Sequence, residues 1–212
     1  MEVVNHIAEA YAQKNTTPLN DVLYQIEEYT NTNHPHAHML SGHVQGKVLE
    51  FISCMIKPKY ILEIGTFTGF SALCLAKGLQ QNGMLHTIEL REEDATIAQQ
   101  FFDKANAKNI QLHKGNALQI IPTITEQWDI VFIDADKTNY INYYELILPN
   151  VKNGGWVIAD NVLFHGQVLE NEIVGKNAKA IDEFNKHVAV DKRVEQVLLT
   201  LRDGLLLIKK YK

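Results

Sequence analysis

Short apolar runs alternate with longer helix-forming segments from Tyr60 onward, and this alternation constrains the fold more than any other feature of the chain. The apolar runs have the length of strands, and the segments between them have the length and composition of helices. We expect strands at Tyr60–Ile64, Leu85–Leu90, Ile110–His113, Ile130–Ile133 and Gly155–Ala159, and helices at Ser71–Leu79, Glu92–Ala107, Tyr140–Leu148 and Lys179–His187. Alternation of this kind predicts a doubly wound α/β fold around a parallel sheet.

The C-terminal segment departs from the alternation. Two β-rich runs, Val194–Leu201 and Leu205–Lys209, flank the turn Arg202–Asp203–Gly204. An Asp-Gly turn between two such runs is typical of a β-hairpin. We therefore expect a mostly parallel, seven-stranded sheet that ends in an antiparallel hairpin.

The N-terminal segment is helical in period and has no predicted strand. Its apolar faces are marked by Val3, Val4, Ile7, Ala8 and Tyr11 and by Leu19, Val22, Leu23 and Ile26. A loop over Thr30–Met39, a helix over Ser41–Met55 and a turn at Pro58 complete it. Since a domain typically has ~150 residues, we expect one domain over 1–212. Within it, helices in 1–57 contribute to a substrate site or a dimer contact, and 58–212 form the ligand-binding sheet.

Charge and cysteine content narrow the class of protein. The chain has 25 acidic and 20 basic residues, a net charge of −5, which argues against binding nucleic acid by phosphate neutralisation. Cys54 and Cys74 both lie in apolar stretches, so we expect buried thiols in a reducing compartment rather than a disulfide framework. No signal peptide or membrane-length apolar run is visible. These features predict a cytoplasmic protein with no membrane and no nucleic-acid partner.

A glycine turn follows the first predicted strand. The segment Glu63–Ser71 has the spacing Gly65-x-x-x-Gly69, which differs from the G-x-G-x-x-G of dinucleotide sites. Glu63 at the strand's end would repel a phosphate and suits a cationic ligand such as a sulfonium. Glu89 ends the second strand, 24 residues after Gly65, where an acid binds ribose hydroxyls in nucleoside-binding folds. The structural alternative is a plain turn and a surface glutamate.

Oxygen-bearing side chains follow two later strands. Asp134 comes after the fourth strand, and Asp160 and Asn161 come after the fifth, so all three are expected at the carboxyl edge of the sheet. Carboxylate and amide oxygens suit Mg²⁺, Mn²⁺ or Ca²⁺, whereas helix capping is the structural alternative. Lys137 follows Asp134 by three residues; near a divalent cation its pKa falls toward that of a general base. The alternative is a solvated lysine or one paired with Asp136.

Taken together, LEIGTFTGFSALCLAKGL, HTIEL, KGNALQIIP, WDIVFIDADKTNYINYY and GGWVIADNVLFHGQV resemble the cation-dependent O-methyltransferases of the caffeoyl-CoA and catechol type, which use S-adenosylmethionine. The resemblance extends from Met39 to the C-terminus. It implies cofactor contacts at Met39, Ser41, Glu63, Gly65, Ser71, Glu89, Ala117 and Asp134, and metal ligands at Asp134, Asp160 and Asn161. It also implies Lys137 as the base, and Phe164 and His165 are candidate acceptor contacts.

Two positions depart from the family pattern, and both bear on ligand contacts. Asn116 stands where many relatives carry Asp, beside the expected adenine contact, and Phe164 stands where many carry Trp. The implied reaction is methylation of one hydroxyl of a catechol-like acceptor, with Mg²⁺ as the expected cation and a homodimer as the expected assembly.

Two other functions use a similar sheet: a nicotinamide oxidoreductase, and a non-catalytic protein that binds an adenosyl ligand. The missing G-x-G-x-x-G and the DADK and DN segments argue against both. Four histidines form a cluster in the sequence. His34, His36 and His38 precede the helix expected over Ser41–Met55, and His43 lies near its start. We interpret these histidines as loop residues, some near the acceptor entrance; a transition-metal site is the alternative.

Overall fold

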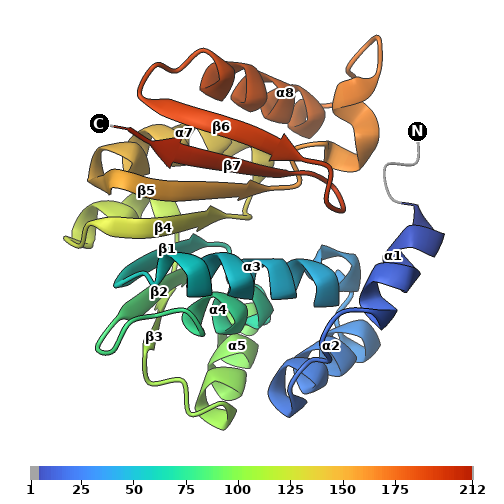
Figure 1. Ribbon diagram of the computed structural model, residues 1–212, viewed down its shortest axis with the longest axis vertical. Helices are drawn as coiled ribbons and strands as arrows, with labels where there is room; N and C mark the ends of the chain where they lie inside the picture. Colours follow the sequence, from blue (N-terminus) through green and yellow to red (C-terminus); the bar gives the residue numbers. More distant parts are fainter. Residues whose placement is uncertain (1–4, 212) are drawn as a thin grey trace.

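The computed structural model describes residues 5–211 and contains a seven-stranded sheet (Figure 1). Its strands are β1 Tyr60–Ile64, β2 Met84–Glu89, β3 Ile110–Lys114, β4 Trp128–Ile133, β5 Val151–Asp160, β6 Val194–Leu199 and β7 Leu205–Lys210. The strand order is β3-β2-β1-β4-β5-β7-β6. Strands β1 to β5 pair in parallel, and β7 is antiparallel to β5 and β6. The predicted doubly wound sheet with a C-terminal antiparallel hairpin is confirmed.

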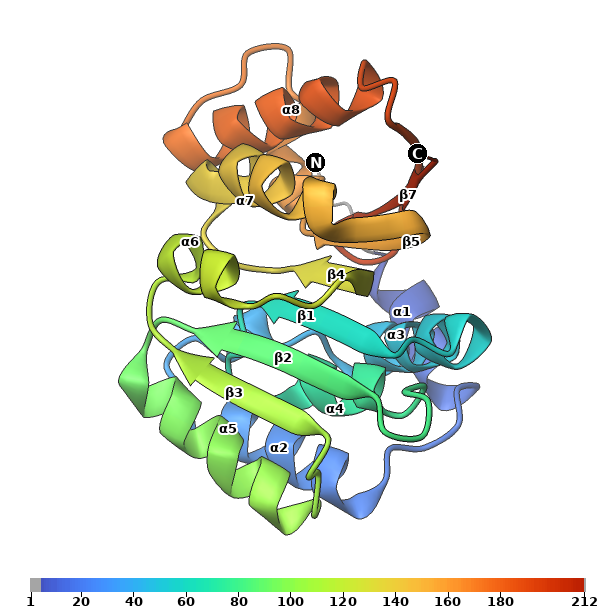
Figure 2. The ribbon, with the colours of Figure 1, turned by 90° about the vertical axis from the view of Figure 1, so that its left-hand side faces the viewer.

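Helices cover both faces of the sheet (Figure 2). They are α1 His6–Lys14, α2 Asp21–Asn33, α3 His43–Ile56, α4 Phe70–Ala76, α5 Glu92–Lys104, α6 Ala117–Ile120, α7 Tyr140–Ile147 and α8 Lys176–Ala189, with 3-10 turns η1 Ala37–Met39, η2 Ile121–Thr123, η3 Lys137–Asn139, η4 Leu148–Asn150 and η5 Phe164–Leu169. In β1, Leu62 and Ile64 pack with α7, whereas Ile61 packs with α4. Alternate residues of a strand thus belong to two separate cores.

Several helices and strands begin or end at residues other than those predicted, and α2 is one example. Helix α2 starts after Asn20, whose side chain accepts a hydrogen bond from Leu23 N, and it continues to Asn33. The loop predicted from Thr30 therefore starts later than expected, because Thr30 is buried and its hydroxyl lies 3.0 Å from that of Thr68. That contact holds the end of α2 against the turn after β1.

Helix α1 does not bury the apolar face that its sequence predicts. Val3 and Val4 lie outside the described residues, and Ile7 and Tyr11 are 84% and 71% exposed. Asn5 caps the helix by accepting from Ile7 N and from the amide after it. The helix is thus fixed by its cap rather than by a buried stripe, and its apolar side chains face solvent.

The expectation of two buried thiols is wrong for one of them. Cys74 on α4 is buried, but Cys54 on α3 is exposed. The neighbouring Ser53 takes the inward position and donates a 2.6 Å hydrogen bond to the carbonyl of Leu75. An apolar stretch on a helix has an outer side as well, and Cys54 lies on it.

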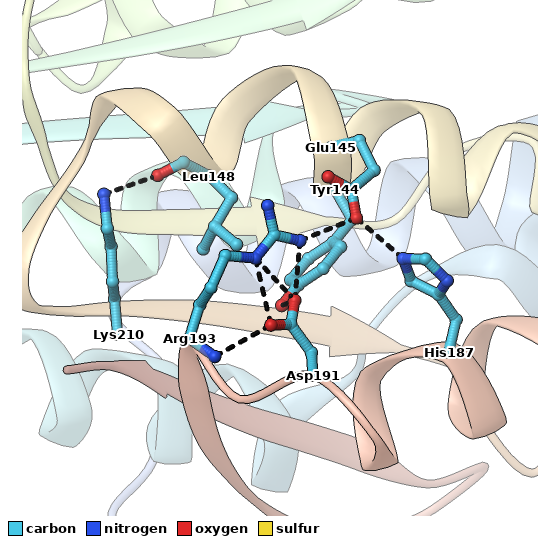
Figure 3. A network of polar contacts seen from close by, with 7 residues as sticks. All are labelled: Tyr144, Glu145, Leu148, His187, Asp191, Arg193 and Lys210. Atoms are coloured by element: carbon cyan, nitrogen blue, oxygen red, sulfur yellow. Dashed lines mark hydrogen bonds and ion pairs between the residues drawn. The ribbon is translucent and has the colours of Figure 1, made fainter. Parts of the chain in front are cut away.

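A network of polar and charged side chains joins α7, α8 and the turn before β6 (Figure 3). The Arg193 guanidinium donates to Asp191 at 2.6 Å and to Glu145 at 2.7 Å. Glu145 also lies 2.7 Å from His187 Nε2, and Asp191 accepts from the Tyr144 hydroxyl at 2.8 Å. We call these five residues the arginine network. Within residues 5–211, none of the helices is long and apolar enough to cross a membrane.

Candidate active site

The candidate site lies where the strand order reverses, between β1 and β4. The backbone N–H of Asp134 donates a 2.9 Å hydrogen bond to the carbonyl of Ile64, so the ends of the two strands are held together. Gly65 has φ +101°, and a Cβ there would overlap the Asp134 carbonyl oxygen. Only glycine fits at this position, because the conformation and the close approach both exclude a side chain. Ligands bind at such a reversal in doubly wound sheets.

Glu63 lies beneath the glycine turn rather than at the mouth of the site. Its carboxylate is fully buried and accepts hydrogen bonds from the hydroxyls of Ser71 at 2.6 Å and Thr87 at 2.5 Å. Burial above all, together with the neighbouring acids Asp134 and Glu89, raises the pKa of Glu63 to about 8, although the hydrogen bonds from the two hydroxyls lower it. A group with this pKa exchanges its proton near neutral pH and can respond to a bound positive charge.

Glu89 supports the glycine turn through its carboxylate. Its Oε2 accepts from the backbone N–H groups of Thr66 at 3.1 Å and Phe67 at 2.8 Å, and its Oε1 accepts from Arg91 N at 2.9 Å. Ala117, which begins α6, lies near the same edge, because Gly115 N donates to the carbonyl of Glu89 at 2.8 Å. The two residues predicted for ribose and adenine thus lie close together.

A pocket opens beside the glycine turn and brings predicted residues together from distant parts of the chain. Its lining comprises Met39, Leu40, Ser41, Gly65, Thr66, Phe67, Phe70, Ser71 and Asp134. Five of these, Met39, Ser41, Gly65, Ser71 and Asp134, are residues that the sequence predicts as cofactor contacts. A larger groove, lined by residues of α2, α4 and the segment before β3, contains none of the predicted residues.

Lys137 joins the oxygen-bearing side chains at the ends of β4 and β5. Its ammonium donates to Asp134 Oδ1 and Asn161 Oδ1 at 2.9 Å each and to the Tyr140 hydroxyl at 2.7 Å. All three ammonium protons are thus used. Burial lowers the pKa of Lys137, but the effects of Asp134 and Tyr140 outweigh burial, so the pKa of Lys137 is raised. Two of the predicted metal ligands therefore converge on one cation position, which the ammonium occupies.

Asp160 is the most enclosed of the predicted ligands. Its Oδ1 accepts from Asn161 N at 2.7 Å, and its Oδ2 accepts from Gln45 Nε2 at 2.5 Å. Burial first and the charge of Asp134 second raise the pKa of Asp160 to about 7, against the lowering effects of Lys137 and of the hydrogen bonds from Gln45 and Asn161. Within residues 5–211, no group of three or more His, Cys, Asp or Glu side chains is arranged to hold a metal ion, and the set here has two carboxylates and one amide.

The segment after β5 has an unusual backbone. Asn161, Phe164 and His165 have φ of +57°, +43° and +55°, a region that residues other than glycine rarely adopt. The Phe164 and His165 rings lie 5.3 Å apart. We call Asn161–His165 the acceptor loop, since it carries one predicted metal ligand and both candidate acceptor contacts. Its strain has to be held by neighbouring structure.

The four clustered histidines do not meet at one point. His34 Nε2 lies 2.8 Å from Asp94, and its ring contacts Phe67 edge-on with the centroids 4.5 Å apart. His43 Nε2 lies 2.7 Å from the carbonyl of Thr17. The rings of His36 and His38 are 6.0 Å apart. The interpretation as loop residues holds for His34 and His36, whereas His38 lies in η1 and His43 begins α3.

Two residues of the site were not predicted. Gln45 lies one turn into α3, where no local motif distinguishes it from a surface glutamine. Tyr140 is fully buried; its hydroxyl accepts from Lys137 and lies 2.9 Å from the carbonyl of Asp160. Its spacing of three residues from Lys137 is the one signal that links it to the site.

The fold and the candidate site are typical of α/β enzymes that bind ligands at the carboxyl edge of the sheet. Comparison with known proteins gives the family. The O-methyltransferase family profile matches residues 13–211. A probable caffeoyl-CoA O-methyltransferase of Dictyostelium discoideum is 33% identical over 94% of this chain and 90% of its own length. A catechol O-methyltransferase of Niastella koreensis is 32% identical over 74% of this chain and 73% of its own length.

Solved structures agree with the sequence comparison. The SAH-bound methyltransferase PaMTH1 of Podospora anserina superimposes with a TM-score of 0.90 at 28% identity, over 97% of this chain and 94% of that protein. This chain therefore belongs to the O-methyltransferase family, and it is an O-methyltransferase rather than an oxidoreductase or a non-catalytic binding protein.

Proposed function

We propose that this chain transfers the methyl group of S-adenosylmethionine to one hydroxyl of a catechol-like acceptor, with the help of a divalent cation. One observation carries the proposal. Asp134 and Asn161 direct their side-chain oxygens at a single cation position, 2.9 Å from each, next to a pocket that the same Asp134 lines. A methyl donor and a cation-bound acceptor would therefore be adjacent.

The cofactor assignment rests on the glycine turn and on the solved relatives. Structures of PaMTH1 and of an O-methyltransferase from Bacillus cereus contain SAH, and each is 28% identical to this chain. Here the corresponding role falls to the pocket beside Gly65 and Ser71, with Glu89 at the ribose and Ala117 at the adenine. The buried carboxylate of Glu63, held near its point of ionisation, complements a positively charged donor.

The donor set fits a divalent cation that prefers oxygen. Asp134, Asp160 and Asn161 provide oxygen side chains and no thiolate or imidazole, which favours Mg²⁺, Mn²⁺ or Ca²⁺ over zinc. A cation bound there supplies the positive charge that lowers the pKa of an acceptor hydroxyl. The hydrogen bonds from the Lys137 ammonium to Asp134 and Asn161 support the proposal, because they bring both oxygens to one positively charged group.

Lys137 would remove the proton of the reacting hydroxyl. The acceptor oxygen then forms a bond to the methyl carbon as the carbon–sulfur bond breaks and leaves S-adenosylhomocysteine. Lys137 accepts a proton only as a neutral amine, yet the charge of Asp134 keeps it protonated in the ligand-free state. The base role therefore requires that another cation neutralises Asp134, which is a further reason to propose a divalent one.

A methylation assay with and without metal tests this function. The purified chain is treated with EDTA, dialysed, and assayed with S-adenosylmethionine and a panel of catechols. We expect turnover only after Mg²⁺, Mn²⁺ or Ca²⁺ is added back, and Asp160→Ala should abolish the metal stimulation. Turnover that is indifferent to EDTA would contradict the metal role. Thermal stabilisation by S-adenosylhomocysteine, without methylation of any catechol, would contradict the acceptor class.

We also propose a homodimer formed through the N-terminal helices. The residues Ile7, Tyr11, Phe51 and Met55 on α1 and α3 are between 57% and 84% exposed. Apolar side chains of this size, gathered on two neighbouring helices, are typical of an interface. Light scattering coupled to size exclusion should give twice the 24.1 kDa chain mass, and Phe51→Ser with Met55→Ser should give one chain mass. A monomeric parent chain would contradict the assembly.

A further inference from the structure

The turn between β6 and β7 has a second role beyond closing the hairpin. In Figure 1 this turn lies beside the segment that follows β5, far from it in sequence. The carbonyls of Asp203 and Gly204 accept from Leu163 N at 2.8 Å and Val162 N at 3.2 Å. A Cβ on Gly204 would come within 2.6 Å of the Leu163 side chain. The turn is therefore packed directly on the acceptor loop.

The Asp203 carboxylate reaches the most strained part of that loop. Its Oδ1 accepts a 2.6 Å hydrogen bond from His165 N, and its Oδ2 is buried, without a hydrogen-bond partner, 3.6 Å from His165 Nδ1. His165 has φ +55° and Phe164 has φ +43°. A hydrogen bond from a strained backbone N–H to a carboxylate is among the stronger single contacts that a side chain can make.

Arg202, next to Asp203, contacts the other side of the site. Its Nη1 donates a 2.9 Å hydrogen bond to the carbonyl of Leu40, which lines the pocket between Met39 and Ser41. A Cβ on Gly42 would lie 3.2 Å from the same nitrogen, so the guanidinium lies close against this backbone. Two adjacent side chains of one turn thus hold two walls of the site that are separated by more than a hundred residues of sequence.

We propose that Asp203 is a positioning residue that sets the acceptor loop, and with it the choice of hydroxyl, while Arg202 positions the pocket wall that contacts the cofactor. This rests on the proposed function, because the acceptor loop contains the predicted metal ligand Asn161 and both candidate acceptor contacts. The contacts of Asp203 and Arg202 are separate, so their substitution should affect different ligands.

The first test reads the loop itself and needs no turnover. Amide hydrogen exchange, followed by mass spectrometry over peptides that cover residues 161–170, reports the protection of His165 N–H. In Asp203→Ala this amide should exchange about tenfold faster, in line with the loss of a hydrogen bond to a charged group. Asp203→Asn keeps an oxygen acceptor and should stay near the parent. Equal exchange in Asp203→Ala and the parent would overturn the proposal.

The second test reads the acceptor. Protocatechuic acid has two inequivalent hydroxyls, and its two methylated products are separated by chromatography with Mg²⁺ present. Asp203→Ala should raise the acceptor KM about five- to tenfold, lower kcat less, and shift the product ratio, because ordered loop contacts fix the bound orientation. Arg202→Ala should instead weaken binding of S-adenosylhomocysteine, with the product ratio unchanged.

Two results of the methylation assay would overturn the positioning role of Asp203. An Asp203→Ala variant with lower kcat, unchanged KM and unchanged product ratio would overturn the positioning role. A product ratio in Asp203→Asn that matches Asp203→Ala would also overturn it, since charge rather than hydrogen bonding would then control orientation. Absence of methylation by the parent chain would refute the proposed function, while the exchange measurement would still decide whether Asp203 orders the loop.

Discussion

The acidic side chains packed near the two ends of α7 have pKa values shifted in opposite directions. Near the start of the helix, Tyr140 contacts Lys137 beside Asp160, whose pKa burial raises to about 7. In the arginine network near its other end, hydrogen bonds from Arg193 lower the pKa of Asp191 to about 2. Burial without sufficient positive charge explains the raised pKa of Asp160, and direct pairing with Arg193 explains the lowered pKa of Asp191.

The difference separates acids that serve the fold from acids that serve a ligand. In the arginine network each carboxylate is paired with a permanent cation that the chain itself supplies (Figure 3). At the site, Glu63 is buried beside hydroxyls and other acids, with no arginine or lysine among its hydrogen-bond donors. Such acids gain most when a positive ligand arrives, which is the behaviour expected of a binding site.

The largest effect is expected from Lys137→Ala, which removes the ammonium group that contacts Asp134 and Asn161. We expect kcat to fall by ~10²–10⁴-fold, the usual contribution of a general base, with the Kd for S-adenosylhomocysteine unchanged. Steady-state methylation and calorimetry measure the two quantities. Lys152→Ala is the matched control, since Lys152 pairs with Asp129 at 2.7 Å outside the pocket. A Lys137→Ala enzyme with the parent's kcat would refute the base assignment.

A second large effect should come from the backbone of the site. Gly65→Ala combines a positive φ with overlap on the Asp134 carbonyl, so we expect a loss of about 2–5 kcal/mol in the free energy of unfolding. Gly175 has a similar φ of +96° but nothing within 4 Å of an added Cβ. Gly175→Ala should therefore cost only the strain, about 1–3 kcal/mol. Urea denaturation compares the two; equal losses would show that close approach adds nothing.

The raised pKa of Glu63 predicts a pH dependence of stability. Its pKa is about 8 in the fold against an ordinary 4.5, so the folded state holds a proton that the unfolded state releases between these values. The free energy of unfolding should therefore fall as pH rises from about 4.5 to 8, by at most about 1.4 kcal/mol per pH unit. In ligand-free Glu63→Gln this fall should be smaller. A parallel pH profile in variant and parent would argue against a protonated Glu63.

The smallest effect should come from Asp191→Asn in the arginine network. The pH dependence of stability due to Asp191 should also run in the direction opposite to that due to Glu63. Loss of the charge should lower the free energy of unfolding at pH 7 by about 1–2 kcal/mol. Because the folded pKa of Asp191 lies below its unfolded value, the difference from the parent should shrink as pH falls toward about 2. Asp182→Asn, which breaks only the surface pair with Lys186, should cost about 0.3–0.5 kcal/mol.

The fold could be predicted because its signals are local and repeated. Each strand of the parallel core is a short apolar run, and the Asp203–Gly204 pair marks the hairpin directly. The close approach of Gly65 to Asp134 was not predicted, because it depends on β1 and β4 being neighbours in the sheet. Boundaries were less certain: β5 starts at Val151 rather than Gly155, because it continues through Gly154 at φ +79°.

The rest of the site depends on contacts that the sequence does not encode locally. Gln45 reaches Asp160 across 115 residues of sequence, and Asp203 reaches His165 across 38. No motif marks Gln45, and the turn motif that contains Asp203 predicts a hairpin but not the contact with His165, so each residue acquires its role from the packing of a helix or a turn. The burial of Glu63 was missed for the same reason, because its covering residues Ser71 and Thr87 come from two other elements.

The contact between Arg202 and Leu40 spans 162 residues, and this has a consequence for how the protein forms. Pairings over such distances carry a high loop-closure cost and tend to form late in folding. A chain emerging from the ribosome can assemble β1 to β4 with their helices well before the last strand exists. Both walls of the site come together only when the hairpin of β6 and β7 docks on β5, so we expect the site to be completed after the parallel core has formed.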